Sequence, residues 1–424
     1  MKDTSQHETL LRNMFSAAVE AASPSKYVAS YLPAEPRGKT VVIGAGKATA
    51  AMAKAVEAHW SKPLSGLIIV PHGPHPACEH IDVVQARHPV PDEAGVTASR
   101  RMLELVSELG ENDLVISLIS GGGSALLSLP GAGISMEDKQ HVHTELLKCG
   151  AAIDEMNCVR KHLSAVKGGR LAAAAYPAKV VTLAISDVPG DNPSTIASGP
   201  TVLNTSTREQ AISIIGRYNI ALPDRVQQLL NSCDADTPTG HDKRMASLQT
   251  HIICKPQQSL MAAANVASRA GVTPLILGDA IEGEAREVGK VMAGIAKQVQ
   301  QYDQPATKPA VLISGGETTV TVRKKGGRGG RNAEFLLGFA AACNLDDEFY
   351  ALSADTDGID GTEDNAGVLW TPRIALQAKQ NALSCEHYLD NNDAWSFFNA
   401  LDALITTGPT HTNVNDFRAI IING

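Results

Sequence analysis

The sequence predicts an α/β protein with two domains, an N-terminal Rossmann-like parallel sheet and a second α/β domain with a mixed sheet. Five short apolar runs carry this prediction, because each stops at small residues and is followed by polar or charged ones. Such runs are typical of strands covered on both faces, which belong to parallel sheets. Ligands of open α/β sheets bind beyond the carboxyl ends of the strands. The residues after each run are therefore candidate site residues. The runs are 41–43, 114–119, 181–185, 311–313 and 350–354.

The first domain is predicted from strand and helix patterns that alternate from Thr40 onward. Asp92 is a cap for a helix that places Met102 and Val106 on one face. Ser135 and Asp138 form the pattern of a capping box before another helix. The predicted strands are 40–43, 66–70, 114–119 and 180–185, and the predicted helices are 47–60, 92–109, 135–149 and 153–166.

A polar segment, 231–246, interrupts the alternation and predicts a surface connection between domains. We therefore expect domains at 1–235 and 249–424. In the second domain the alternating stretch 317–322 predicts an antiparallel strand. The other strands expected there are 251–254, 274–277, 310–313, 349–353 and 403–406, and the helices are 257–270, 283–302 and 332–343.

Composition excludes several classes of protein. The formal net charge of −8 over 424 residues argues against a general nucleic-acid binder. The seven cysteines are dispersed without a C-x-x-C pair, which favours reduced thiols. There is no signal-peptide pattern at the N-terminus and no apolar run near the ~20 residues of a membrane span. We expect a cytoplasmic enzyme with small-molecule ligands and without a nucleic-acid or membrane partner. Whether the protein forms a homo-oligomer stays open.

The loop after the first strand contains Gly44, Gly46 and Lys47. It fails as a dinucleotide fingerprint, because Thr49 stands at the third glycine position and no acidic residue follows the second strand. It also fails as a Walker loop, because Lys47 is followed by Ala48 rather than Ser or Thr. What remains is a lysine beside backbone N–H groups at the start of a helix, an arrangement that attracts anions.

Two further glycine-rich loops are candidate phosphate sites. In the first loop, the three glycines Gly121, Gly122 and Gly123 allow successive backbone N–H groups to converge on an oxyanion. A turn that binds no ligand is the alternative interpretation. A similar loop follows the fourth apolar run. The residues assigned to phosphate or nucleotide are Gly44, Gly46, Ser120, Gly121, Gly122, Gly123, Ser124, Gly315, Gly316 and Glu317.

The run 323–332 alternates cations and glycines just before a predicted helix. Arg331 can therefore reach a phosphate from a helix N-terminus. A nucleic-acid interpretation of the run is weak, because it is short and has no interleaved aromatic residues.

Two acidic loops follow strands and offer the hard oxygen ligands that Mg²⁺ prefers. One contains Asp187 and Asp191, and the other contains Asp355 and Asp357. For either loop a plain Asp-Gly turn is nearly as good an interpretation. A zinc site at 72–80 is disfavoured because no distal ligand pair matches it, and a serine hydrolase is disfavoured because there is no G-x-S-x-G elbow.

Taken in order, these motifs resemble those of the class II glycerate kinases, the glycerate 2-kinase family whose C-terminal part carries the MOFRL region. The resemblance covers nearly the whole chain and places the MOFRL region at about 308–418. The matching segments are 42–48, 88–92, 120–126, 159–171, 186–191, 198–201, 314–319, 329–334, 356–361, 407–410 and 412–416. His411 departs from the small or apolar residue expected at its position.

The resemblance implies ATP-dependent phosphorylation of D-glycerate to 2-phosphoglycerate with Mg²⁺, in a cleft between the two domains. It makes Lys47 and Arg331 the catalytic cations, neither of which is expected to be needed for folding. Asp187 is assigned to catalysis, through Mg²⁺ or the attacking hydroxyl. The assigned metal ligands are Asp191, Asp355 and Asp357, and either Arg160 or Lys167 is assigned to the glycerate carboxylate.

Two other functions stay open at this point. The family has also carried the name hydroxypyruvate reductase, so the main alternative is an NAD(P)-dependent reductase. The defects in the dinucleotide fingerprint argue against it. A sensor that binds its ligand without turnover is the third possibility, although the sequence contains no appended DNA-reading module.

Overall fold

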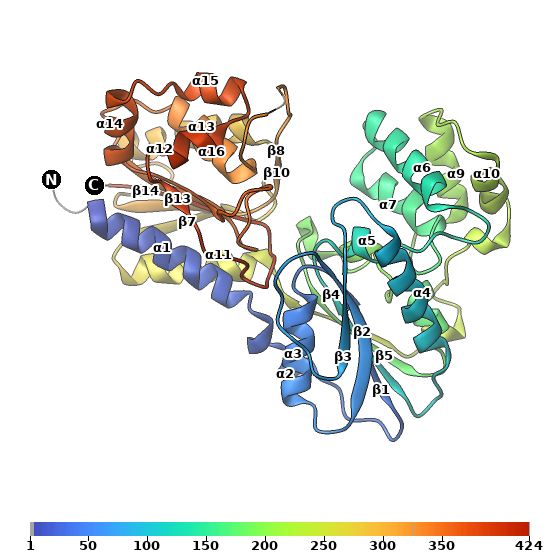
Figure 1. The fold of residues 1–424 in the computed structure, drawn as a ribbon. Coiled ribbons are helices and arrows are strands. Elements are labelled where there is room, and N and C mark those ends of the chain that lie inside the picture. Colours follow the sequence, from blue (N-terminus) through green and yellow to red (C-terminus); the bar gives the residue numbers. More distant parts are fainter. Residues whose placement is uncertain (1–3, 325, 424) are drawn as a thin grey trace. The chain divides into compact units, whose positions relative to one another are not determined.

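The computed structural model describes residues 4–324 and 326–423. Lys325, part of the basic run before Arg331, lies outside the described residues. The chain forms two compact units. One is Pro24–Ile253, and the other joins the N-terminal segment through Ser23 to the segment from Cys254 onward. Each unit contains a sheet with helices, which confirms the predicted α/β class (Figure 1). No helix in the described ranges is long and apolar enough to span a membrane.

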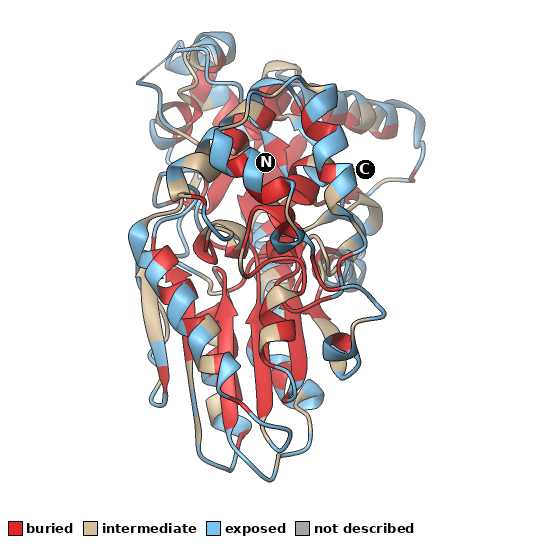
Figure 2. Ribbon diagram, turned by 90° about the vertical axis from the view of Figure 1, so that its right-hand side faces the viewer, coloured by how far each residue is buried: buried red, intermediate tan, exposed pale blue. Residues whose placement is uncertain are grey.

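The sheet of the unit 24–253 has the strand order β3-β2-β1-β4-β5-β6. The registers from β3 through β5 are all parallel, as the apolar runs predict. Every residue of β1 and β4 is buried, and the strands of this sheet are largely red in Figure 2. The strands are β1 (Thr40–Ala45), β2 (Leu64–Pro71), β3 (Ile81–Ala86), β4 (Leu114–Ile119), β5 (Lys179–Ile185) and β6 (Leu248–Cys254).

Two groups of helices belong to this unit. One group packs on the sheet. Its helices α4 (Glu93–Ser107), α5 (Gly123–Leu126) and α8 (Arg170–Ala174) share one apolar core with the strands, for example through Met102 and Val106, and α3 (Thr49–His59) packs against β1, β2 and β4. The other has its own apolar core, for example Leu146 and Val159, and lies together in Figure 1. It consists of α6 (Met136–Lys148), α7 (Ile153–His162), α9 (Arg208–Arg217) and α10 (Asp224–Leu230).

The capping box predicted at the start of α6 is present. The Ser135 hydroxyl accepts from the Asp138 N–H at 3.1 Å, and the Asp138 carboxylate accepts from the Ser135 N–H at 2.8 Å. These bonds satisfy two donors that the first turn of a helix leaves without a partner.

We expect Ser135→Ala to lower the free energy of unfolding of this unit by about 1 kcal/mol, the usual cost of losing such a cap. Chemical denaturation monitored by circular dichroism measures the change. Ser107→Ala removes a hydroxyl that donates to the carbonyl of Leu103 within its own helix, and it serves as the control. Equal stability of the two variants would contradict a capping role for Ser135.

The sheet of the second unit has the order β13-β12-β11-β14-β9-β7 and is mixed, as predicted. Only β7 and β9 pair in parallel; β11, β12, β13 and β14 pair with their neighbours antiparallel. The strands are β7 (Thr273–Gly278), β9 (Ala310–Ser314), β11 (Phe349–Asp355), β12 (Gly367–Trp370), β13 (Leu404–Ile405) and β14 (Asp416–Ile422).

Four predictions for this sheet are wrong. The strand expected at 251–254 is part of β6, which belongs to the parallel sheet of the other unit. The run 350–354 forms β11, which is antiparallel to both neighbours, because an inner antiparallel strand can also be buried on both faces. The strand predicted at 403–406 is present as β13 but is not the last one, because β14 follows it and lies inside the sheet. The stretch 317–322 contains only the two-residue strand β10 (Thr318–Thr319), paired in parallel with β8 (Gly283–Glu284).

The helices of this unit include α1, whose apolar face (Leu11, Met14, Phe15) packs into the core of the C-terminal sheet. The sequence predicted residues 1–235 as one domain. The compact units differ from this prediction because the N-terminal segment packs with the C-terminal half of the chain. The helices are α1 (Thr4–Ala21), α11 (Pro256–Arg269), α12 (Ala285–Tyr302), α13 (Arg331–Ala341), α14 (Pro372–Gln380), α15 (Cys385–Asp390) and α16 (Ala394–Asn399).

Short elements complete the chain. A single helical turn, α2 (Val28–Tyr31), precedes the parallel sheet. The polar connection predicted at 231–246 contains two 3-10 turns. The 3-10 turns of the chain are η1 (Pro24–Lys26), η2 (Pro189–Asp191), η3 (Ile196–Ser198), η4 (Cys233–Ala235) and η5 (Lys243–Met245).

Candidate functional site

The loops after β1 and β4 are bound to each other. The Lys47 N–H donates to the Gly121 carbonyl at 2.8 Å, and the Ala48 N–H donates to the buried Ser120 hydroxyl at 3.0 Å. Gly46 has a φ of 142°, and a Cβ there would lie 2.1 Å from the Ser120 hydroxyl oxygen. The glycines of the first loop therefore let the two loops pack in contact.

This contact corrects the prediction of exposed N–H groups beside Lys47. Helix α3 begins at Thr49, not at Lys47, and the two N–H groups before it are occupied by the β4 loop. Thr49 stands where a dinucleotide loop has its third glycine, and its hydroxyl lies 3.2 Å from that of Ser120. The backbone donors that would meet a pyrophosphate in a dinucleotide site thus have partners within the protein.

The glycine turn after β4 lies beside the Lys47 side chain. Gly122 has a φ of 79°, and a Cβ on it would come within 3.1 Å of the His88 ring and 3.5 Å of the Lys47 Cγ. The N–H groups of Gly121 and Gly122 donate to no backbone oxygen in the described part of the chain, whereas the Gly123 N–H donates to the Ser120 carbonyl at 3.2 Å. Part of the predicted oxyanion cradle is therefore available to a ligand.

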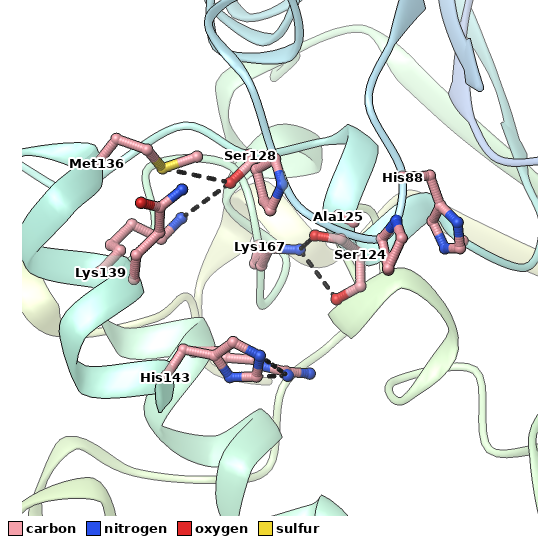
Figure 3. A pocket seen from close by; sticks show the side chains of 13 residues that line it. His88, Ser124, Ala125, Ser128, Met136, Lys139, His143 and Lys167 are labelled. Atoms are coloured by element: carbon pink, nitrogen blue, oxygen red, sulfur yellow. Dashed lines mark hydrogen bonds between the residues drawn. The ribbon is translucent and has the colours of Figure 1, made fainter. Parts of the chain in front are cut away.

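A pocket of about 200 Å³ opens beside this turn, bounded by helices α6 and α7 and by the loop before α4 (Figure 3). Its positive residues, Lys139, Arg160 and Lys167, stand on different elements. No aspartate or glutamate is among its lining residues. The pocket is lined by His88, Pro89, Pro91, Gly122, Ser124, Ala125, Ser128, Met136, Lys139, Gln140, His143, Arg160 and Lys167.

The three cations of the pocket contact neutral groups. The Lys167 Nζ donates to the Ser124 carbonyl at 2.7 Å and contacts the Ser124 hydroxyl at 3.2 Å. Arg160 lies 3.4 Å from the Asn157 amide oxygen and 3.0 Å from both ring nitrogens of His143. Since no carboxylate offsets these charges, the pocket favours an anionic ligand.

The positive charge of the pocket affects the acid–base behaviour of its members. Burial, with the nearby charge of Arg160, lowers the pKa of Lys139 to about 8. Burial and the cations Lys139, Arg160 and Lys161 lower the pKa of Lys167 well below its ordinary value. Burial, Arg160 and Lys139 lower the pKa of His143 to about 4. An anion in the pocket would raise all three pKa values, because it favours their charged forms.

We expect His143 to stay neutral from pH 5 to 8 and to titrate near pH 4, because its positive form is desolvated and repelled by two cations. A pH titration of the imidazole nitrogens by NMR measures this, and His143→Gln assigns the signal. Saturating inorganic phosphate should move the midpoint to higher pH. A His143 signal that titrates at its ordinary pH with and without phosphate would contradict the electrostatic description of the pocket.

A buried polar chain supports the floor of the pocket. The Ser124 hydroxyl lies 2.7 Å from that of Ser198, which donates to the Asn157 amide oxygen at 3.3 Å. Ala197 and Ser198 both adopt left-handed backbone, with φ of 51° and 60°. Such conformations cost of order 1–3 kcal/mol each in non-glycine residues and cluster at functional sites. The motif 198–201 therefore holds the glycine turn and α7 in place.

The first acidic loop follows β5, next to the glycine turn in the sheet. β5 pairs with β4, so residues 186–191 leave the same edge of the sheet as residues 120–124. Asp187 and Asp191 are both half-buried, and Asp191 has a φ of 54° behind Pro189 and Gly190. The strand order therefore places this acidic loop beside the glycine turn.

In the second unit, Arg331 is held by three carboxylates. Its guanidinium donates to Asp416, Glu317 and Asp355, each at 2.7 Å. Asp416 also binds the fully buried Arg418. Burial opposes the charge of Arg331, but the carboxylates raise its pKa above the ordinary value. Arg331 thus joins the end of β11, the start of β14 and the loop after β9 by ion pairs, a role that the sequence did not predict.

Arg331 is the first residue of α13, which confirms its predicted position at a helix N-terminus, and its contact with a phosphate stays a prediction. Asp360 already caps α13, since its two carboxylate oxygens accept from the N–H groups of Asn332 and Ala333, both at 2.9 Å. A Cβ on Gly330 would collide with this carboxyl group, which explains the glycine. Burial raises the pKa of Asp360 to about 6 although the two N–H groups oppose the shift.

The glycines after β9 serve packing. Gly316 has a φ of 97°, and a Cβ there would lie 2.2 Å from the Ile281 carbonyl oxygen. The Gly316 carbonyl accepts from the Asp416 N–H, and the Gly315 carbonyl accepts from Arg418. Glu317 is half-exposed and binds Arg331. The assignment of these residues to nucleotide stays a prediction.

The predicted metal ligands are distributed over both units. Asp355 contacts Arg331 and accepts from the Asp357 N–H at 3.0 Å. Asp191 belongs to the other unit. Within 4–324 and 326–423, no three His, Cys, Asp or Glu side chains gather as a preformed metal-binding group.

The structure thus brings Gly122, Ser124, Arg160 and Lys167 into one pocket. The sequence analysis did not single out Lys139 and His143, which also line it. Their i, i+4 spacing on the helix opened by Ser135 was the available signal, since it places both side chains on one face.

Comparison with known proteins gives two family matches. A model described as a domain of unknown function, DUF4147, matches residues 10–231, and the model of the MOFRL family matches residues 310–416. Together they match parts of both compact units.

Relatives of nearly equal length match over the whole chain. A protein of Agrobacterium vitis with a provisional hydroxypyruvate reductase name is 48% identical, over 97% of this chain and 94% of its own. The D-glycerate 2-kinase of Thermotoga maritima is 39% identical, over 98% of each chain. The crystal structure titled glycerate kinase from Thermotoga maritima superposes with a TM-score of 0.88 at 38% identity, and covers 98% of this chain and 99% of that one.

Proposed function

We propose, because this chain belongs to the glycerate 2-kinase family with a MOFRL region, that it transfers the γ-phosphoryl group of ATP to D-glycerate and forms 2-phosphoglycerate. The observation that supports this most directly is the pocket with three cations and no carboxylate beside the glycine turn. A cytoplasmic location belongs to the proposal, because the reaction consumes ATP and all seven cysteines are free thiols.

In the proposed reaction the 2-hydroxyl oxygen of glycerate bonds to the γ-phosphorus while the bond from that phosphorus to the bridging oxygen of ADP breaks. Catalysis of such a transfer depends on positioning and on stabilising charge at the transferring group. Arg160 and Lys167 bind the carboxylate of glycerate, since both charges face the pocket. Lys47 and the N–H groups of Gly121 and Gly122, which donate to no backbone oxygen in the described ranges, stabilise the transferring phosphoryl group.

The loop after β5 supplies the acidic groups of the proposal. Asp187 accepts the proton that leaves the hydroxyl, and Asp191 binds Mg²⁺. Mg²⁺ in kinases is usually held by one or two carboxylates together with phosphate oxygens, so this loop fits the ion without a larger cluster. Bound Mg²⁺ neutralises charge on the phosphates. Asp355 and Asp357 are the other candidate ligands, and Asp355 is engaged by Arg331.

In this proposal Arg331 has a different role from Lys47. Its three ion pairs make it first a positioning residue for Glu317, Asp355 and Asp416. The catalytic role that the family resemblance implies for Arg331 requires that its guanidinium exchange one of these partners, such as the half-exposed Glu317, for a phosphate oxygen.

One relative has a hydroxypyruvate reductase name. The alternative to the proposed kinase is therefore the NAD(P)-dependent reduction of hydroxypyruvate. The occupied N–H groups of Lys47 and Ala48 argue against dinucleotide binding at the first loop.

A pair of assays on the same preparation separates the functions. We expect ADP release with ATP, Mg²⁺ and D-glycerate, and no change in nicotinamide absorbance with hydroxypyruvate. Phosphorus NMR of the product then distinguishes the 2-phosphate from the 3-phosphate. Nicotinamide oxidation without ADP release would refute the kinase proposal, and binding of glycerate without either reaction would favour a sensor.

A further inference from the structure

The pocket beside the glycine turn contains more positive charge than glycerate can offset. Lys139, Arg160 and Lys167 together bring up to three positive charges to a pocket without carboxylates. Glycerate has one negative charge, whereas a phosphate monoester adds roughly 1.5 to 2 more at pH 7. The charge of 2-phosphoglycerate therefore matches that of the pocket, and the charge of glycerate does not.

We propose that this pocket binds the carboxylate and the transferred phosphoryl group together, and that Lys139 is the residue that distinguishes the phosphorylated ligand from glycerate. The inference rests on the proposed function, because it names the product of that reaction as the ligand. It adds a residue that no motif of the sequence indicated and assigns it to specificity.

The contacts of the two lysines differ in a way that supports separate roles. Lys167 makes two bonds to Ser124, the shorter at 2.7 Å, next to the glycine turn. Lys139 has only long contacts, 3.5 Å to the Ser128 hydroxyl and 3.5 Å to the Leu129 carbonyl. Figure 3 shows it entering beside Met136 and Ser128, away from His88. Lys139 can therefore exchange weak neutral contacts for a charge-assisted bond to a phosphoryl oxygen.

The charged and titratable residues that line the pocket with Lys139 are positive or neutral, and the acidic Glu137 and Asp138 of the same helix are not among the lining residues. Arg160, Lys167, His143 and His88 line the same pocket. Because burial and Arg160 lower the pKa of Lys139 to about 8, part of the free protein lacks this proton near pH 8. A bound phosphoryl dianion favours the protonated lysine, so binding should take up a proton.

The test is isothermal calorimetry on the full chain with 2-phosphoglycerate, D-glycerate and inorganic phosphate at pH 7. Losing one charge-assisted hydrogen bond costs about 1.5–3 kcal/mol, so Lys139→Gln should weaken 2-phosphoglycerate roughly tenfold to a hundredfold. It should weaken glycerate by less than about threefold. The matched control is Lys148→Gln, because Lys148 is exposed at the end of the same helix and pairs with Glu145.

A measurement on the unaltered protein tests the inference without a variant. Between pH 7 and pH 9 the affinity for 2-phosphoglycerate should fall about tenfold as Lys139 loses its proton. At pH 8, titrations in two buffers of different ionisation enthalpy should show proton uptake with 2-phosphoglycerate and less with glycerate.

The outcomes separate the inference from the proposed function. Unchanged binding of 2-phosphoglycerate in Lys139→Gln, or an equal loss for glycerate, overturns the inference while ADP release in the kinase assay still upholds the function. Absence of ADP release, with Lys139-dependent binding of inorganic phosphate, overturns the function and leaves an anion pocket. If the variant does not fold, a flat pH profile and the absence of proton uptake in the unaltered protein overturn the inference.

Discussion

Lys47→Ala is expected to lower the turnover of D-glycerate by two to three decades without changing the stability of the protein. Removing one group that stabilises charge at a transferring centre costs roughly 3–4 kcal/mol of barrier. The backbone of Lys47 is held by its bond to the Gly121 carbonyl, which alanine retains. Only the side chain beyond Cβ is lost, and it is this part that passes Gly122.

Steady-state ADP release at saturating glycerate measures the effect, and a thermal melt verifies the fold. Lys54→Ala is the matched control, because Lys54 is an exposed lysine on helix α3, the helix that follows Lys47. Turnover within threefold of the unaltered protein would remove Lys47 from the mechanism. An equal loss in Lys54→Ala would indicate a general effect of charge rather than a contact with the phosphoryl group.

Asp416→Ala should destabilise the C-terminal unit by roughly 3–5 kcal/mol, the usual cost of removing one partner of a buried ion pair. Asp416 is fully buried, binds Arg331 at 2.7 Å and Asn332 at 2.8 Å, and pairs with Arg418, whose side chain is also buried. The substitution leaves Arg418 without its only carboxylate partner within 4 Å in the described part of the chain. Arg331→Ala is expected to destabilise the same unit, contrary to the expectation from sequence that it folds normally.

Chemical denaturation followed by a probe in this unit, such as the Trp370 fluorescence, measures the loss. Glu287→Ala is the control, because the Glu287–Lys290 pair is exposed and contributes less than about 1 kcal/mol. Although burial acts in the opposite direction, Arg331 and Arg418 lower the pKa of Asp416. Its stabilisation is therefore present above the unfolded pKa near 4 and is lost as the pH falls below it. A stability change no larger than that of Glu287→Ala would contradict the structural role of Asp416.

Much of the parallel-sheet unit follows from local patterns. β1, β4 and β5 are apolar runs bounded by glycine or serine, and the strand order then places their polar ends side by side. Ser135 caps α6 as its spacing predicts. Such features need only neighbouring residues to be interpreted, and they indicated the glycine turn with Gly122 and Ser124. Arg160 and Lys167 were assigned only together with the family resemblance.

The rest depends on contacts between residues distant in the sequence. Arg331 lies 85 residues from Asp416, and nothing near Arg331 indicates that three carboxylates surround it. The role of the glycines at 315–316 as packing positions depends likewise on Ile281 and Arg418. Lys139 was overlooked because a single lysine on an amphipathic helix is usually on its solvated face. Its position in a pocket becomes visible only when α6 packs beside α7.

The association of α1 with the C-terminal half has a consequence for how the protein is made. When the first helix leaves the ribosome, the strands that cover its apolar face, Leu11, Met14 and Phe15, have not yet been synthesised. Domains generally fold as units during translation. The segment from Pro24 to Ile253 can therefore complete its sheet first. The opening helix must wait for the last strands, so truncation at either terminus should damage the same half of the molecule.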